Sequence, residues 1–115
     1  MMAAKPRGSE VMTEWYGVRC VFRWTEAVEP SYEERVTVWH AVDVDSALAL
    51  AEAEAREYAK EMGAAYVGLA QAYATGNEEL VSGSEVFSLL RDSALPPEEY
   101  VDRFFDTGDE HQGTA

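Results

Sequence analysis

Residues 15–25 read WYGVRCVFRWT, and this stretch decides the fold because its side chains alternate in character. Every second residue from Tyr16 to Trp24 is apolar, whereas Arg19 and Arg23 belong to the intervening set. Successive side chains of a β-strand point to opposite faces of a sheet, so a period of two is typical of a half-buried strand. The stretch is therefore predicted to be a strand whose apolar set is turned toward the core.

A second strand is predicted over residues 32–42, after a short turn that contains a proline. Val36 and Val38 belong to one alternating set of this strand, and Arg35 and Trp39 belong to the other. The short connection to the first strand predicts an antiparallel hairpin.

A long helix is predicted over residues 43–62, with Asp43 as its N-cap and Gly63 as its C-cap. The segment between these caps contains no glycine or proline and is rich in alanine, a strong helix former. So many alanines also indicate close approach between the helix and a sheet. The apolar stripe expected to face that sheet comprises Leu48, Ala51, Ala55, Tyr58, Ala59 and Met62.

Two further strands are predicted over residues 64–74 and 85–91, and these are expected to form a second hairpin. A short helix is predicted to begin around Pro96 and Pro97 and to end by Gly108. The predicted fold class is α+β: a four-stranded antiparallel sheet in ββαββ order packed on one long helix, plus a short C-terminal helix.

A chain of 115 residues has the usual length of a single domain. We expect a flexible leader at residues 1–13, a single α+β domain at residues 14–106 and a loose tail at residues 107–115. Met12 is a candidate for the natural start, because the patterned sequence begins just after it. A sheet with one long helix leaves a face poorly covered, and the terminal helix, a second subunit or a ligand is expected to cover it.

Candidate ligand or interface residues follow from the pairing of the first two strands. If the apolar sets of both strands face the core, three arginines share the opposite face with two tryptophans. Arginine beside aromatic rings suits recognition of carboxylate or phosphate groups, or stacking. Cross-strand pairing with local acids and a dimer interface are the other interpretations. The predicted set comprises Trp15, Arg19, Arg23, Arg35 and Trp39, together with Thr37.

The composition excludes some classes of partner. Acidic residues number 22 and basic residues 9, which gives a formal net charge of -13. Nucleic acids and anionic membranes both attract clustered lysine and arginine, so neither is an expected partner. The longest apolar-rich stretch, residues 64–73, is too short to span a bilayer, and no secretory signal is recognised. The single cysteine, Cys20, allows no internal disulfide and fits a cytoplasmic location.

No catalytic residue, metal site or cofactor is predicted. His40 lacks both a free orienting acid and a nucleophile close in sequence, and Cys20 belongs to the apolar set of its strand. Glu33 and Glu34 are adjacent, so they point to opposite faces and cannot form a carboxylate pair. The acids near the C-terminus match no calcium loop, and phosphate-binding glycine motifs are absent from the sequence.

Several short motifs follow one another along the chain: Trp15-Tyr16, Val18-Arg19, Tyr32-Glu33-Glu34-Arg35, Ala41 before the predicted helix, and Glu85-Val86-Phe87-Ser88. Over residues 14–91 this order resembles a bacterial family catalogued as domain of unknown function 4288. The motifs Pro97-Glu98-Glu99-Tyr100 and Phe104-Phe105-Asp106-Thr107-Gly108 resemble an extension in actinobacterial relatives. That family has no assigned activity, so the resemblance implies a small cytosolic bacterial protein and transfers no active site.

We expect an interaction module that binds a second copy of itself or another protein, rather than an enzyme. One alternative is a sensor or an enzyme that uses the arginine-rich face on a small anionic ligand. Another alternative is an acidic antidote or immunity-type protein that blocks a basic toxin. The acidic face in that case would include Glu52, Glu57 and Glu61 of the predicted helix.

Overall fold

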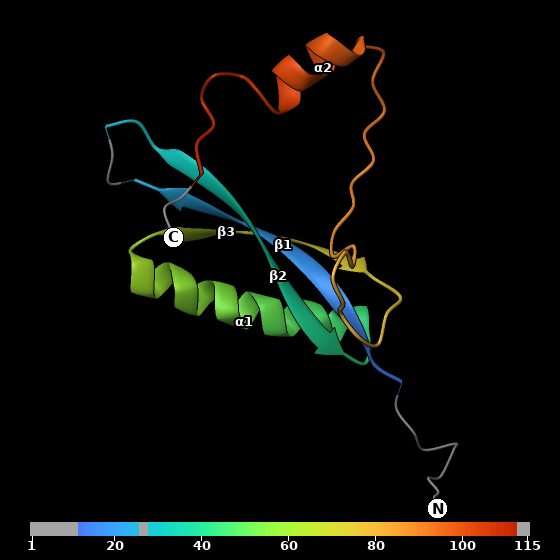
Figure 1. Cartoon of the computed structure of the whole chain (residues 1–115). Helices are drawn as coiled ribbons and strands as arrows, with labels where there is room; N and C mark the ends of the chain where they lie inside the picture. Colours follow the sequence, from blue (N-terminus) through green and yellow to red (C-terminus); the bar gives the residue numbers. More distant parts are fainter. Residues whose placement is uncertain (1–11, 26–27, 113–115) are drawn as a thin grey trace, which may run out of the picture.

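The computed structural model describes residues 12–25 and 28–112. Most of the predicted leader and the last three residues of the predicted tail lie outside the described residues. The chain forms two layers, a sheet and the helix α1 that covers one of its faces (Figure 1). The second helix, α2, lies apart from them on the other side of the sheet. The elements are, in order, β1 (Glu14–Trp24), β2 (Ser31–Ala41), α1 (Val44–Met62), β3 (Ala65–Ala74) and α2 (Pro97–Phe104).

The sheet has three antiparallel strands in the order β2-β1-β3, so the strand with the strongest alternation is central. β1 and β2 pair without interruption up to Trp24 opposite Ser31, which confirms the predicted hairpin. The pairing of β1 with β3 shifts register between Cys20 and Phe22. Gly68 of β3 lies within this irregular part at a φ of 94°, a left-handed conformation that favours glycine.

The prediction of α1 is confirmed, including both of its caps. The Asp43 carboxylate accepts a hydrogen bond of 2.8 Å from the backbone N–H of Ser46, which satisfies one of the free donors of the first turn. Gly63 adopts the left-handed conformation at a φ of 75°, and its N–H donates to the carbonyl of Ala59.

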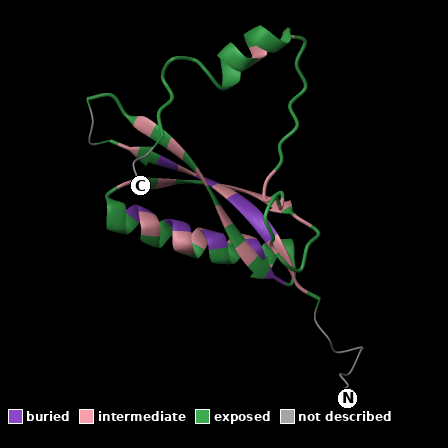
Figure 2. Ribbon diagram, viewed as in Figure 1, coloured by how far each residue is buried: buried purple, intermediate pink, exposed green. Residues whose placement is uncertain are grey.

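The core lies between β1 and α1 (Figure 2). Val18 and Phe22 are completely buried, which confirms that the apolar set of the first strand faces inward. The residues of α1 that are buried against them are all alanines. Because alanine is small, the helix approaches the sheet closely. The buried set comprises Tyr16, Val18, Cys20, Phe22, Ala41, Ala47, Ala51, Ala55 and Ala59.

The predicted fourth strand, residues 85–91, is wrong, and so is the four-stranded ββαββ sheet. This segment passes across the face of the sheet near β1 instead of pairing with an edge. A Cβ built on Gly17 would lie only 1.5 Å from the carbonyl oxygen of Val86, so the two backbones are in direct contact there. Val86 and Phe87 are half-buried in this contact, whereas Leu89 and Leu90 are exposed, so the apolar residues of the segment do not form one strand face.

The predicted short C-terminal helix is confirmed as α2, with Pro97 at its first position. α2 contacts none of the three strands and does not contact α1 (Figure 1). Nearly all of its residues are exposed (Figure 2), including Val101 at 46% and the adjoining Phe105 at 61%.

Candidate functional site: the open face of the sheet

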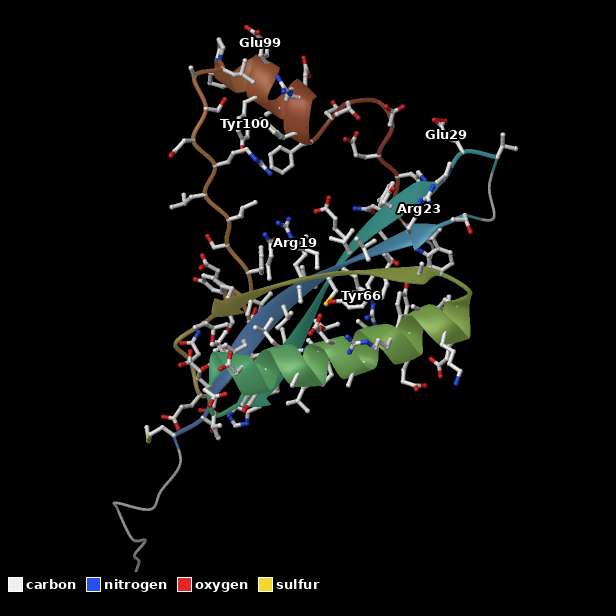
Figure 3. All side chains as sticks on the ribbon, turned by 180° about the vertical axis from the view of Figure 1, so that it is seen from behind. Arg19, Arg23, Glu29, Tyr66, Glu99 and Tyr100 are labelled. Atoms are coloured by element: carbon white, nitrogen blue, oxygen red, sulfur yellow. The ribbon has the colours of Figure 1, made fainter. Side chains whose placement is uncertain are left out.

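The sheet face turned away from α1 is called the open face here. Since β1 pairs with β2 in a known register, the residues that share this face can be assigned from both strands. In Figure 3, Arg19 and Arg23 point to the side on which α2 lies, whereas Tyr66 lies between the sheet and α1. The open face comprises Trp15, Gly17, Arg19, Val21 and Arg23 of β1 and Tyr32, Glu34, Val36, Val38 and His40 of β2.

One end of the open face is covered by residues 84–88. Their backbone rests on Gly17, and the Phe87 ring lies 6.2 Å from that of Tyr73 of β3. The Arg19 guanidinium stacks over Phe87 at 5.1 Å. Tyr73 donates a hydrogen bond to Glu85, and this bond raises the pKa of the Tyr73 hydroxyl. This end of the face is therefore closed by the chain itself.

Residues 84–88 lie over β1 and β3, and the part of the open face that they leave uncovered is called its free end here. It runs along β2 from Tyr32 to Val38, includes Arg23 of β1, and carries large apolar side chains on β2. Tyr32 is 64% exposed, Val36 is 42% exposed and Val38 is 37% exposed. Arg23 lies beside Tyr32, with its guanidinium 5.9 Å from the centre of that ring. No helix or strand of the described residues covers this part of the sheet.

Arg19 connects all three strands across the middle of the open face. Its Nε donates to the Gln71 side chain of β3 at 3.1 Å, and its Nη1 donates to the Glu34 carboxylate of β2 at 3.1 Å. The guanidinium is thereby engaged by local partners. This arrangement stabilises the sheet and leaves little of Arg19 for an external anion.

The structure does not bring the five predicted site residues together. Trp15, Arg19 and Arg23 lie on the open face, but Arg35 and Trp39 lie on the face covered by α1. Placing all three arginines on one face was therefore wrong. The reason is that the valine-containing set of β2, and not its arginine-containing set, continues the outward set of β1: Arg19 pairs with Val36.

Arg35 and Trp39 fill the space beside the small alanines of α1. The Arg35 guanidinium donates two hydrogen bonds to the Glu54 carboxylate, at 2.7 and 2.9 Å, and stacks over the Tyr58 ring at 3.9 Å. The bonds to Glu54 raise the pKa of Arg35 further. Trp39 donates from Nε1 to the Thr37 hydroxyl at 2.7 Å. These contacts bind β2 to α1.

A second polar cluster joins the other end of β2 to α1. The Glu33 carboxylate accepts hydrogen bonds from the Tyr58 hydroxyl at 2.8 Å and from Trp24 Nε1 at 3.1 Å. Burial, with this donation to Glu33, raises the pKa of Tyr58. Within the described residues no buried side-chain polar atom lacks a partner, so this layer offers no unused group to a substrate.

The chemical groups of the helix–sheet layer are poorly suited to catalysis. Cys20 is buried, and burial raises the pKa of its thiol, so little reactive thiolate forms near neutral pH. Burial also raises the pKa of Tyr66, which donates a 2.6 Å hydrogen bond to Glu52. On the open face, His40 stacks on Trp15 with 5.0 Å between ring centroids.

Residues 12–25 and 28–112 contain neither a metal site nor a membrane-spanning helix. No group of three or more His, Cys, Asp and Glu side chains there is arranged to hold a metal ion. No helix in the same part of the chain has the length and apolar character needed to cross a membrane.

Sequence reasoning missed the residues that distinguish the open face. Tyr32, Val36 and Val38 were expected to face the core, because valine is usually buried. The signal that could have placed them correctly is the size of the other alternating set of β2. Arg35 and Trp39 are long enough to lie alongside an alanine-rich helix, whereas valines in their place would leave space unfilled.

Comparison with known proteins gives no relative. No family model matches the sequence, and no curated protein or solved structure shows significant similarity. The resemblance to domain of unknown function 4288 therefore stays a prediction, and the site must be interpreted from its own geometry.

Proposed function

We propose that this protein is an interaction module that self-associates through the open face of its sheet. The observation that carries the proposal is the free end of that face, where Tyr32, Val36 and Val38 remain exposed with no described element over them. A group of exposed apolar side chains with polar groups among them is typical of a site for another protein. Here Glu34 lies between Tyr32 and Val36 along β2, and Arg23 pairs with Tyr32.

The energetics favour association but limit its strength. These three side chains are already partly buried, so removing their remaining surface from water contributes about 1 kcal/mol each. A two-fold interface uses every residue twice and so doubles this contribution. The total, about 6 kcal/mol, lies at the lower end of the cost of association, about 4–15 kcal/mol. The open face alone therefore supports a weak dimer, and a tighter one needs additional contacts.

The anionic-ligand alternative has lost its geometric basis. Arg35 is on the face covered by α1 and is paired with Glu54, while Arg19 is engaged by Glu34 and Gln71. Arg23 alone remains, and a single exposed arginine is not a binding site. The antidote alternative stays a prediction, since Glu57 and Glu61 are exposed on α1 but nothing specific points to a basic partner.

The proposal is tested by placing a charge on the free end of the open face. Val36→Glu in the full-length chain is expected to convert a dimer into a monomer, because each copy would then bury a carboxylate without a partner. Size-exclusion chromatography with light scattering measures the molar mass of each variant. Leu50→Glu is the matched control, because Leu50 is similarly exposed, at 46%, but lies on α1.

Two results would oppose the proposal. One is a wild-type protein that stays monomeric at the highest concentration reached. The other is a dimer that is weakened by Leu50→Glu and not by Val36→Glu, which would place the interface on the helix layer. Circular dichroism of each variant checks that the fold is retained.

A further inference from the structure

α2 has an apolar side that no other helix or strand of the described residues contacts. The Tyr100 and Phe104 rings lie 4.8 Å apart, and Phe105 lies 5.9 Å from Tyr100. Arg91 holds this cluster together, because its guanidinium stacks over Phe104 at 4.1 Å and donates to the Tyr100 hydroxyl at 3.0 Å. The cluster is thus formed locally, although most of it is exposed. A preformed aromatic cluster in solvent is suited to docking on another surface.

The connection to α2 holds it away from its own sheet. Leu95 and Pro96 each precede a proline, which restricts both to extended conformations, and Pro96 has φ −62° and ψ 158°. These two residues are therefore held extended, and the link that follows residues 84–88 carries α2 away from the sheet (Figure 1). Because α2 makes no contact with the sheet of its own chain, the open face of a second copy is the surface considered for it.

Charge also matches α2 to the free end of the open face. Glu98 and Asp102 are four residues apart, so they lie on one side of α2 beside its apolar stripe. Arg23 lies at the free end of the open face and forms no ion pair within the described residues. In a chain with a net charge of -13, this exposed arginine beside Tyr32 is a charge complement for the acidic side of α2.

We infer that two copies exchange their C-terminal arms, so that α2 of each copy docks on the free end of the partner's open face. Phe104 and Phe105 pack against Val36 and Val38 of the partner, and the acidic side of α2 faces Arg23. This inference rests on the proposed self-association and names the segment that fills the interface. It also supplies the apolar contact that the sheet residues lack by themselves.

Cysteine cross-linking tests the exchange in the full-length chain. Val36→Cys and Phe104→Cys variants are prepared separately, mixed in equal amounts and treated with a short bifunctional maleimide. The expected result is a cross-linked dimer in the mixture and none in either variant alone. The wild type is the background control, since its only cysteine, Cys20, is buried. Val81→Cys mixed with Phe104→Cys is the positional control, because Val81 is exposed outside the open face.

Each other outcome identifies a different arrangement. A Val36→Cys/Phe104→Cys double variant that cross-links only within one chain would show that α2 closes on its own sheet and would overturn the inference. Val36→Cys that cross-links to itself would show that bare sheets pack together, which also overturns it. Both of the proposals fail if light scattering finds no dimer. A dimer without any cross-link between positions 36 and 104 overturns the arm exchange alone.

Discussion

Gly17 is the single residue that decides how the open face is divided. It is buried in the central strand, and the carbonyl of Val86 occupies the space where any other residue would carry its Cβ. The absence of a side chain lets residues 84–88 rest on the sheet and close one end of the face. The β2 side of the face stays open, with Tyr32, Val36 and Val38 exposed along it, although Val38 pairs with Gly17.

Gly17→Ala is expected to detach residues 84–88 from the sheet and to lower the free energy of unfolding by about 1–3 kcal/mol, as overpacking does. Chymotrypsin should then cut after Phe87 faster than in the wild type. Gly76→Ala is the control, because a Cβ there meets no atom within 4 Å, although its φ of 77° strains an alanine. Equal cleavage after Phe87 in both variants would contradict the contact at Gly17.

Arg35 shows how a charged residue can be structural. It is held by two hydrogen bonds to Glu54 and by the Tyr58 ring, and both members of the ion pair are about two-thirds buried. Such bidentate pairs contribute more to stability than exposed pairs do.

A double-mutant cycle of Arg35→Ala and Glu54→Ala is expected to give a coupling energy of about 1 kcal/mol in denaturant unfolding. The same cycle on Arg19 and Glu34 should give less than about half of that, because Glu34 is largely exposed. If the two coupling energies proved equal, the structural role given to the Arg35–Glu54 pair would be wrong.

At the scale of elements, α1 is the part of the fold that the sequence specifies best. Its N-cap is Asp43, whose hydrogen bond from Ser46 lowers the pKa of that carboxyl below its usual value of 3.8. A carboxyl with a lowered pKa in the folded state stabilises that state above its unfolded pKa. This stabilisation is lost as the pH falls through the folded pKa.

Asp43→Ala is therefore expected to lower stability at pH 7, and the difference from the wild type should shrink as the pH falls below about 4. Asp43→Asn keeps a capping side chain but cannot titrate, so its stability should lack this component of pH dependence. Urea unfolding at several pH values measures the effect. A difference between Asp43→Ala and wild type that stayed constant down to pH 2 would contradict the assignment.

Local periodicity predicted four elements correctly, and it failed where distant contacts decide. The two hairpin strands, α1 and the strand now seen as β3 follow from side-chain spacing and caps, which are local. Residues 85–91 look like a strand because they are apolar, but their neighbour is the backbone at Gly17, 69 positions from Val86. Which residues of β1 and β2 share a face of the sheet is likewise set by the register of their pairing and not by either strand alone.

The candidate site was predictable only in part for the same reason. Trp15, Arg19 and Arg23 were placed together correctly because they belong to one strand. Arg35 and Trp39 were misplaced because their face depends on which side the alanine-rich helix covers. The function proposed here is an interaction surface. Its apolar residues include the valines of β2 that were expected to face the core.

At the scale of the whole molecule, the chain is a sheet with one covered face, one partly covered face and an arm that holds α2 away from both (Figures 1 and 2). A layer architecture is stable when each apolar face is buried against another element. The free end of the open face and the aromatic cluster of α2 both lack such an element within the described chain. The proposed association of two copies would supply it.

Hydroxyl-radical footprinting of the unmodified protein at low and high concentration tests most directly whether the open face is the association surface. Oxidation of Tyr32 is expected to fall as the concentration rises and dimers form. Oxidation of Met62, which is 49% exposed at the end of α1, should stay the same. Tyr32 oxidation that does not change while the molar mass doubles would contradict the account.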